Sequence, residues 1–114
     1  MARERRVSRR EPAPATLRDW LERHTAAAPE ALRVRVLEYA APLATRADFP
    51  AALAAAGDEA LARALSGAGD RSVALDLLAA DALITLALLA QAEQAPDALQ
   101  AFAASRLRVH LPTR

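Results

Sequence analysis

The chain has 114 residues, of which 54% are hydrophobic, and a formal net charge of +1. This length fits a single domain, and the apolar content excludes a wholly disordered chain. Because the sequence contains no cysteine, disulfides, cysteine-ligated metals and cysteine nucleophiles are excluded as well.

The apolar residues are mostly strong helix formers. There are 32 Ala and 18 Leu, against 5 Val and a single Ile. Ala and Leu favour helices, whereas β-branched and aromatic residues favour strands. The 15 basic side chains are all Arg, which we attribute, like the high alanine content, to a bacterial genome rich in G and C. The composition therefore predicts an all-α fold, a compact bundle of four to six helices.

Residues 1–15 are expected to form a disordered basic tail. Residues 1–10 hold five Arg and one acid, whereas the other 104 residues hold 10 Arg and 13 acids. Arginine clusters neutralise phosphates, so one hypothesis is a nucleic-acid tether, although the tail has no aromatic residue for base stacking. The alternatives are a solubilising tail and an arm that a protein partner orders. The arginines concerned are Arg3, Arg5, Arg6, Arg9 and Arg10.

A short helix is predicted over about residues 17–27. Thr16 can cap it, because its hydroxyl can accept a hydrogen bond from a free backbone N–H of the first turn. Leu17, Trp20 and Leu21 recur on one face. Trp20 either packs onto the bundle or offers its ring to a partner, since tryptophan is over-represented among interface hot spots.

Two further helical segments are predicted before a loop at residues 66–70. Pro29 suits the first position of one helix, and Pro42 should end or kink it. Asp48 resembles the N-cap of the next. Gly57 lies inside that segment, so the helix either breaks there, with Asp58 starting a new one, or runs through with a weak point, and we favour the break.

The segment 71–94 gives the strongest helix prediction, because it lacks Gly and Pro and is dense in Leu and Ala. Few polar residues interrupt either side, so this long penultimate helix is expected to be buried nearly all round. Its most apolar stretch, 82–90, is too short to span a bilayer, so no membrane span is expected. Pro96 should open a last helix. The single helical domain would cover residues 16–109, with a frayed end at 110–114.

Asp81 interrupts an apolar face of this long helix. A carboxylate buried there must be paired, hydrogen-bonded or protonated. Our first interpretation is a buried ion pair with an arginine of another helix or of the helix start. The alternatives are that the face is only partly covered and Asp81 reaches water, that Asp81 recognises a partner protein, or that it lines a catalytic pocket. The candidate arginines are Arg33, Arg35, Arg63 and Arg71.

The sequence shows no familiar catalytic pattern. It has no HExxH motif, no glycine-rich phosphate loop and no nucleophile elbow. Neither His24 nor His110 has an acidic or histidine neighbour four residues away. We therefore expect no catalytic residues, no cofactor and no metal, and a protein that is not an enzyme.

The sequence does not specify a function beyond the class of small all-α domains. The leading hypothesis is a non-catalytic helical protein–protein interaction module, that is, a small subunit, adaptor or regulator. The apolar content of so short a chain leaves surface to bury against a protein partner or another copy. Trp20 and Leu88 are the candidate contact residues. The alternatives are a nucleic-acid-associated protein tethered by its arm and an enzyme that uses Asp81. Since no secretory signal is visible, a cytoplasmic location is expected.

Overall fold

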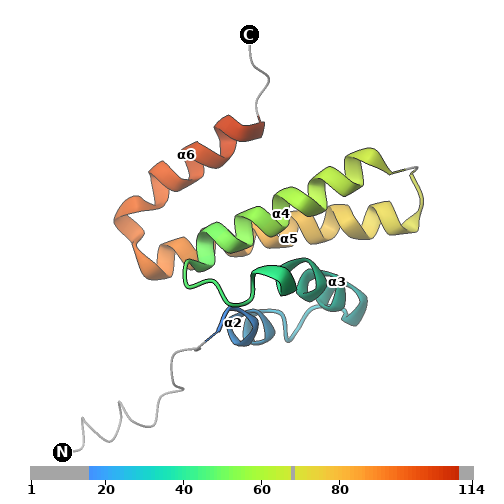
Figure 1. Cartoon of the computed structure of the whole chain (residues 1–114), viewed down its shortest axis with the longest axis horizontal. Coiled ribbons are helices and arrows are strands. Elements are labelled where there is room, and N and C mark those ends of the chain that lie inside the picture. Colours follow the sequence, from blue (N-terminus) through green and yellow to red (C-terminus); the bar gives the residue numbers. More distant parts are fainter. Residues whose placement is uncertain (1–15, 68, 111–114) are drawn as a thin grey trace, which may run out of the picture.

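The computed structural model describes residues 16–67 and 69–110, with side chains up to residue 108. These residues form five α-helices and no strand (Figure 1), which confirms the prediction of an all-α bundle. The predicted basic arm, including its five arginines, lies outside the described residues, as do residues 111–114. The helices are α2 (Leu17–His24), α3 (Glu30–Ala40), α4 (Phe49–Ser66), α5 (Arg71–Gln94) and α6 (Leu99–His110), with 3-10 turns at Ala41–Leu43 and Pro96–Ala98.

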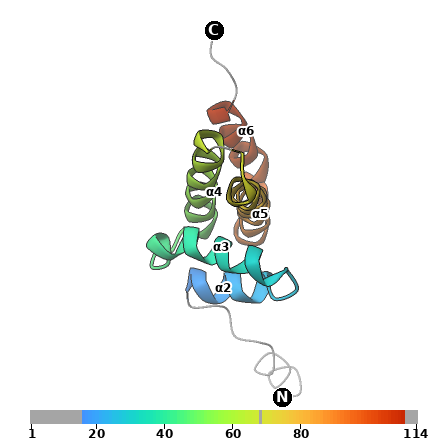
Figure 2. The same cartoon turned by 90° about the vertical axis from the view of Figure 1, so that its right-hand side faces the viewer.

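The helices α4 and α5 form an antiparallel hairpin at the centre of the molecule. The helices α2 and α3 lie against one side of this hairpin, and α6 turns back on the other side (Figures 1 and 2). Small side chains line the contact between α4 and α5, which lets the two helix axes approach closely. The buried small residues are Ala52, Ala54, Ala56, Gly57, Ala60 and Ala64 on α4, and Ala79, Ala80, Ala87 and Ala90 on α5.

The helix starts follow the predicted capping signals. The Thr16 hydroxyl accepts a hydrogen bond from the Asp19 amide at 3.1 Å, and Asp48 caps α4 in the same way at 3.2 Å. The first helix is shorter than expected and ends at His24. Pro29 is the residue just before α3, one place earlier than its predicted position.

The predicted helix break at Gly57 is wrong, because α4 continues from Phe49 to Ser66. Gly57 is buried where α4 meets α5, and a Cβ atom at this position would lie 2.8 Å from Ile84 Cδ1. Glycine therefore serves a close approach between two helices here, and not a turn.

The prediction that α5 is buried nearly all round is also wrong. Its buried residues occupy one stripe, whereas Leu77, Leu78 and Leu89 on other faces are 52%, 54% and 39% exposed. The inner stripe is mostly alanine, which allows close packing against α4. The buried residues are Asp76, Ala79, Ala80, Leu83, Ala87 and Ala90.

By length and composition alone, α5 is able to cross a membrane, and it is the one helix in the described part of the chain that is. The prediction from residues 82–90 underestimated the apolar length, because the neighbouring turns are apolar too. This property does not establish a span, since the core helix of a soluble protein has the same length and composition.

Candidate functional site

A polar groove of about 730 Å³ lies where α3 crosses α4 and the first half of α5. Its walls carry charged and hydroxyl side chains together with a few apolar residues. The polar lining residues are Arg35, Glu38, Tyr39, Glu59, Arg63, Ser72 and Asp76.

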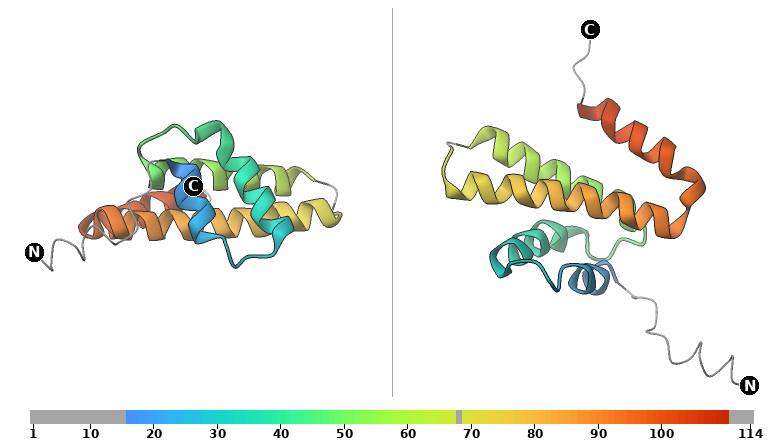
Figure 3. Two further views of the ribbon diagram at one scale, coloured as in Figure 1. Left: turned by 90° about the horizontal axis from the view of Figure 1, so that it is seen from below. Right: turned by 180° about the vertical axis from the view of Figure 1, so that it is seen from behind.

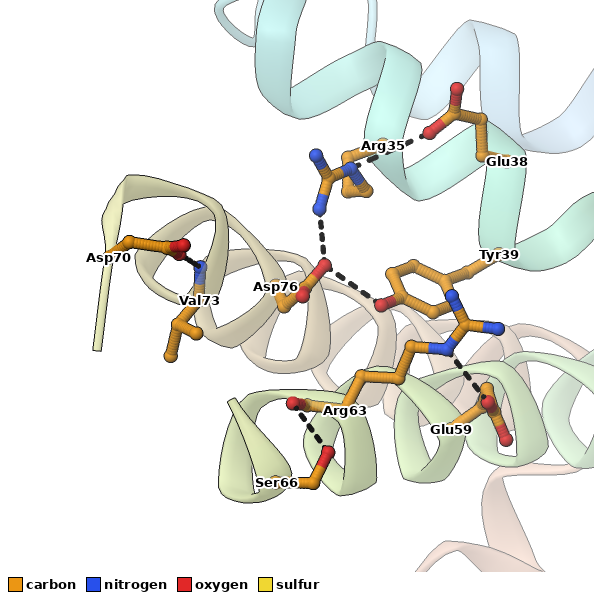
Figure 4. Close-up of polar contacts among 9 residues, drawn as sticks. All are labelled: Arg35, Glu38, Tyr39, Glu59, Arg63, Ser66, Asp70, Val73 and Asp76. Atoms are coloured by element: carbon orange, nitrogen blue, oxygen red, sulfur yellow. Dashed lines mark hydrogen bonds and ion pairs between the residues drawn. The ribbon is translucent and has the colours of Figure 1, made fainter. Parts of the chain in front are cut away.

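Asp76 is the centre of this polar cluster and is only 8% exposed. Two residues of α3, Arg35 and Tyr39, donate hydrogen bonds to its Oδ1 atom, the Tyr39 hydroxyl at 2.8 Å (Figure 4). They are four residues apart and so share one face of α3. From α4, the Arg63 guanidinium lies 5.8 Å from the centre of the Tyr39 ring, within the range of a cation–π interaction, and pairs with Glu59.

The surroundings keep Asp76 ionised and Tyr39 protonated at neutral pH. Burial by itself would raise the pKa of Asp76, but the hydrogen bonds from Tyr39 and Arg35 and the nearby arginine charges outweigh it and lower that pKa. Burial and the hydrogen bond to Asp76 raise the pKa of Tyr39. Neither group is therefore adjusted to exchange a proton near pH 7.

The cluster is well suited to hold helices together. Asp76 links α5 to α3, and both arginines of the groove already contact carboxylates: Arg35 those of Glu38 and Asp76, and Arg63 that of Glu59. Across the residues that the structure describes, no group of three or more His, Asp or Glu side chains could hold a metal ion.

The prediction of a buried ion pair at Asp81 is wrong, because this side chain is exposed. The buried acid is Asp76, about 140° away around α5. Arg35, one of the predicted partners of Asp81, pairs with Asp76 instead. The reason is that the alanine-rich side of α5 faces the bundle, so the leucine-rich side of Asp81 is left outside. The alternative in which Asp81 reaches water is the one that the structure shows.

Trp20 packs inside the bundle and is 4% exposed, so its ring does not face a partner. Its Nε1 atom donates a hydrogen bond to Glu93 Oε1 at 3.0 Å, and its ring stacks on His24 with 4.0 Å between the ring centres. The interpretation of Trp20 as a contact residue is thus wrong, and the packing alternative is correct. The ring anchors α2 to the C-terminal end of α5.

The outer face of α5 is the second candidate site. Seen from behind, α5 lies in front of α4 (Figure 3, right), and α6 lies above the C-terminal half of α5 in Figures 1 and 2. Leu88 lies on this face and is half-buried, so its predicted contact role stays a prediction. We define the outer face as Ala74, Leu77, Leu78, Asp81, Thr85, Leu88, Leu89 and Ala92.

The sequence did not lead us to predict that Tyr39 and Asp76 are hydrogen-bonded to each other. A usable signal was present, because Asp76 begins a stripe of small residues with Ala79, Ala80 and Ala87. Small residues at this spacing mark the side on which helices pack most closely, and an acid on that side is the one that needs a partner.

The structure thus defines a small all-α domain with a polar cluster inside and a helix face on α5 that carries exposed leucines. Comparisons of the chain with protein-family models, with curated proteins and with solved structures found no match.

Proposed function

We propose that this chain is a non-catalytic protein–protein interaction module whose binding surface is the outer face of α5. The exposed leucines of this face carry the proposal. Leu77 and Leu78 are each about half exposed in the longest helix of the described chain. Clustered apolar side chains in water mark interaction sites, because burying them against a partner is favourable by roughly 25 cal/mol per Å².

The polar residues of the outer face favour a protein partner over a lipid surface. Asp81 and Thr85 lie near its middle and are exposed. A carboxylate is costly to place in the hydrocarbon of a membrane. A protein partner can instead supply a hydrogen-bond donor to Asp81 and an acceptor to Thr85, so the face keeps its polar groups satisfied when it is covered.

The polar groove supports the non-catalytic part of the proposal. Its central carboxylate is ionised and already accepts two hydrogen bonds, and its phenol donates one of them. These hydrogen bonds hold α3 against α5. The alternative of a nucleic-acid tether depends on residues outside the described part of the chain, and no described residue favours it.

Photo-crosslinking from the outer face tests the proposal. The photoreactive residue p-benzoylphenylalanine replaces Leu78 in the full chain, expressed in its own host cells. The matched control carries the same residue at Arg18, an exposed position on α2. We expect position 78 to form protein adducts of defined mass and position 18 to form none. Equal adducts from both positions, or none from position 78, would contradict the proposal.

A further inference from the structure

The loop end of the α4–α5 hairpin extends beyond α6 (Figure 1). Two leucines of this end are largely in water: Leu65 of α4 is 78% exposed, and Leu77 of α5 is 52% exposed. Side chains exposed to this degree contribute little to the contact between α4 and α5. They are available to contact another molecule.

The register of the hairpin brings these two leucines together. A Cβ atom on Gly67 would touch Val73, so these two residues are level with each other. Leu65 comes two residues before Gly67, and Leu77 comes four residues after Val73. Because the helices are antiparallel, the two leucines lie within about 3 Å of the same level along the hairpin.

The face of α4 that carries Leu65 is the face that α6 contacts. Leu61 is one turn before Leu65, and Asp58 is nearly one turn before Leu61, so all three share one face. Asp58 pairs with Arg106 of α6. Leu61 is half-buried and packs against the core, which leaves Leu65 as the exposed end of this stripe.

The side of α5 that carries Leu77 also faces α6 further along the helix. Leu77 and Asp81 are one turn apart, and Leu88 is two turns further along the same face. Leu88 belongs to the C-terminal half of α5, above which α6 lies (Figures 1 and 2). Leu77 and Asp81 thus lie on the α6 side of the hairpin but nearer the loop. We call Leu61, Leu65, Leu77 and Asp81 the distal surface.

The helix α6 shows which chemistry this side of the hairpin accepts. Its Phe102 packs against the hydrophobic core, and Arg106, one turn later, pairs with Asp58 of α4. An apolar side chain and an arginine thus meet apolar side chains and an acid of the hairpin. The distal surface offers the same combination, because exposed leucines lie beside Asp81, which is exposed as well.

We infer that the distal surface binds an amphipathic helix of a partner protein, with apolar side chains against the leucines and an arginine or lysine against Asp81. The inference rests on the proposed function and names the chemistry of the partner. The bound helix would continue the line of α6 along the hairpin. Amphipathic helices recognise such surfaces through apolar anchors three or four residues apart.

Charge favours a basic partner helix over a second copy of this chain. The charged residues that α4 and α5 place next to these leucines, Asp58 and Asp81, are both acids. Two copies that met through this surface would bring their Asp81 carboxylates together, and like charges at an interface are unfavourable. A basic side chain of a partner instead gains an ion pair, and this pair sets the orientation of the bound helix.

A peptide with the sequence of α6 tests the inference, because it has the proposed chemistry. The probe is a fluorescein-labelled peptide of residues 96–110. A hydrocarbon staple between positions 100 and 104, on the side opposite Phe102, keeps the peptide helical. The full chain keeps its own α6, whose covalent link gives it a high effective concentration at its own place. We expect fluorescence anisotropy to show saturable binding of one peptide per chain.

Two variants of the chain locate the bound peptide. Leu65→Ser and Leu77→Ser should each weaken binding by about tenfold, because each removes an exposed apolar contact. The matched control is Val34→Ser, at a 43% exposed position of α3 on the other side of the hairpin, and it should leave the affinity unchanged. Circular dichroism of each variant confirms that it is folded. Binding that neither leucine variant weakens would overturn the inference.

A charge swap tests the ion pair independently. Asp81→Arg in the chain and Arg106→Glu in the peptide should each weaken binding several-fold, because each places like charges together. The two changes combined should restore most of the affinity. Losses that simply add would show that Asp81 does not face the arginine, and would overturn the inference.

The outcomes separate this inference from the proposed function. If the peptide does not bind while position 78 still forms adducts in the host cells, the inference fails and the proposed function stands. A dimer in sedimentation equilibrium that Leu65→Ser dissociates would also overturn the inference, because a second copy would then occupy the distal surface. If position 78 forms no adducts, the proposed function fails, and the inference fails with it.

Discussion

Asp76 and Asp81 lie on the same helix, yet the structure gives them opposite environments. Asp76 is buried and accepts hydrogen bonds from Arg35 and Tyr39, whereas Asp81 is exposed. A buried carboxylate needs donors because water no longer solvates it. The difference is set by where α3 crosses α5, since the two donors come from α3.

Replacing these two acids by alanine should have unequal effects on stability. Asp76→Ala leaves the Arg35 guanidinium and the Tyr39 hydroxyl without their acceptor, which should cost about 2 kcal/mol. The value is moderate because the Arg35 side chain is 25% exposed and water can solvate it in part. The control Asp81→Ala should cost less than about 0.5 kcal/mol at a concentration where the chain is monomeric. Urea unfolding followed by Trp20 fluorescence measures both, and equal losses would contradict the assignment.

Asp76 should also make stability depend on pH in the acidic range. Its folded pKa is lowered, because the hydrogen bonds and arginine charges outweigh the effect of burial. As pH falls, the unfolded chain therefore binds the proton first, and the folded state loses stability from about pH 5 downward. Above that pH the contribution is fully present.

The reference for this pH effect is Asp76→Asn, which cannot titrate at this position. Its free energy of unfolding, subtracted from that of the original chain at each pH, should give a difference that is constant near neutrality and shrinks in acid. A difference that grows as pH falls would show that burial dominates the pKa of Asp76.

At the scale of the elements, small residues decide how α4 and α5 meet. The inner sides of both helices are mostly Ala, with Gly57 against Ile84 at the tightest point. Alanine favours helix formation and also keeps the helix axes close. A Leu-rich side packed inward would force the axes apart, so most of the larger side chains of α5, apart from Leu83, lie outside its buried stripe.

The contact at Gly57 predicts non-additive mutations. Gly57→Ala should gain up to about 1 kcal/mol from helix propensity but lose it by displacing the Ile84 methyl, so the single change should not stabilise. Ile84→Val removes that methyl and should cost about 1 kcal/mol alone. In urea unfolding, the double variant should be more stable by roughly 0.5–1 kcal/mol than the summed changes in unfolding free energy of the two single variants predict.

The control for this experiment is Ala62→Gly, at an exposed position of the same helix. It should lose about 1 kcal/mol, which shows that α4 responds to helix propensity. Simple additivity of Gly57→Ala and Ile84→Val would mean that the two positions do not touch.

At the scale of the whole molecule, the five helices of the described residues do not enclose α5 completely. It packs against α4 at its side, with α3 below and α6 above its C-terminal half (Figure 2), while Leu77 and Leu78 remain about half exposed. Covering the exposed part of the outer face with a protein partner would bury Leu77 and Leu78. Association would then add to the stability of the fold by mass action. The same exposed leucines explain why α5 is apolar on all sides although it is not buried all round.

The helix ends were predictable from the sequence because their causes are local. Thr16 and Asp48 cap helices through hydrogen bonds to residues three positions later, and the loop at 66–70 is marked by its glycines. Gly57 misled the prediction because the same residue type serves a turn in one context and close packing in another. Local signals do not distinguish these two uses.

By itself, the sequence determined an all-α fold, its capping residues and its long penultimate helix, because helix propensity and capping act within a few residues. Only the tertiary structure decided which side of α5 faces inward, and therefore that Asp76 is buried while Asp81 is exposed. A helix that is apolar on every side has no periodic signal to choose its inner face. The choice is made by residues far away in the sequence, such as Arg35 and Tyr39, that meet it only in the folded chain.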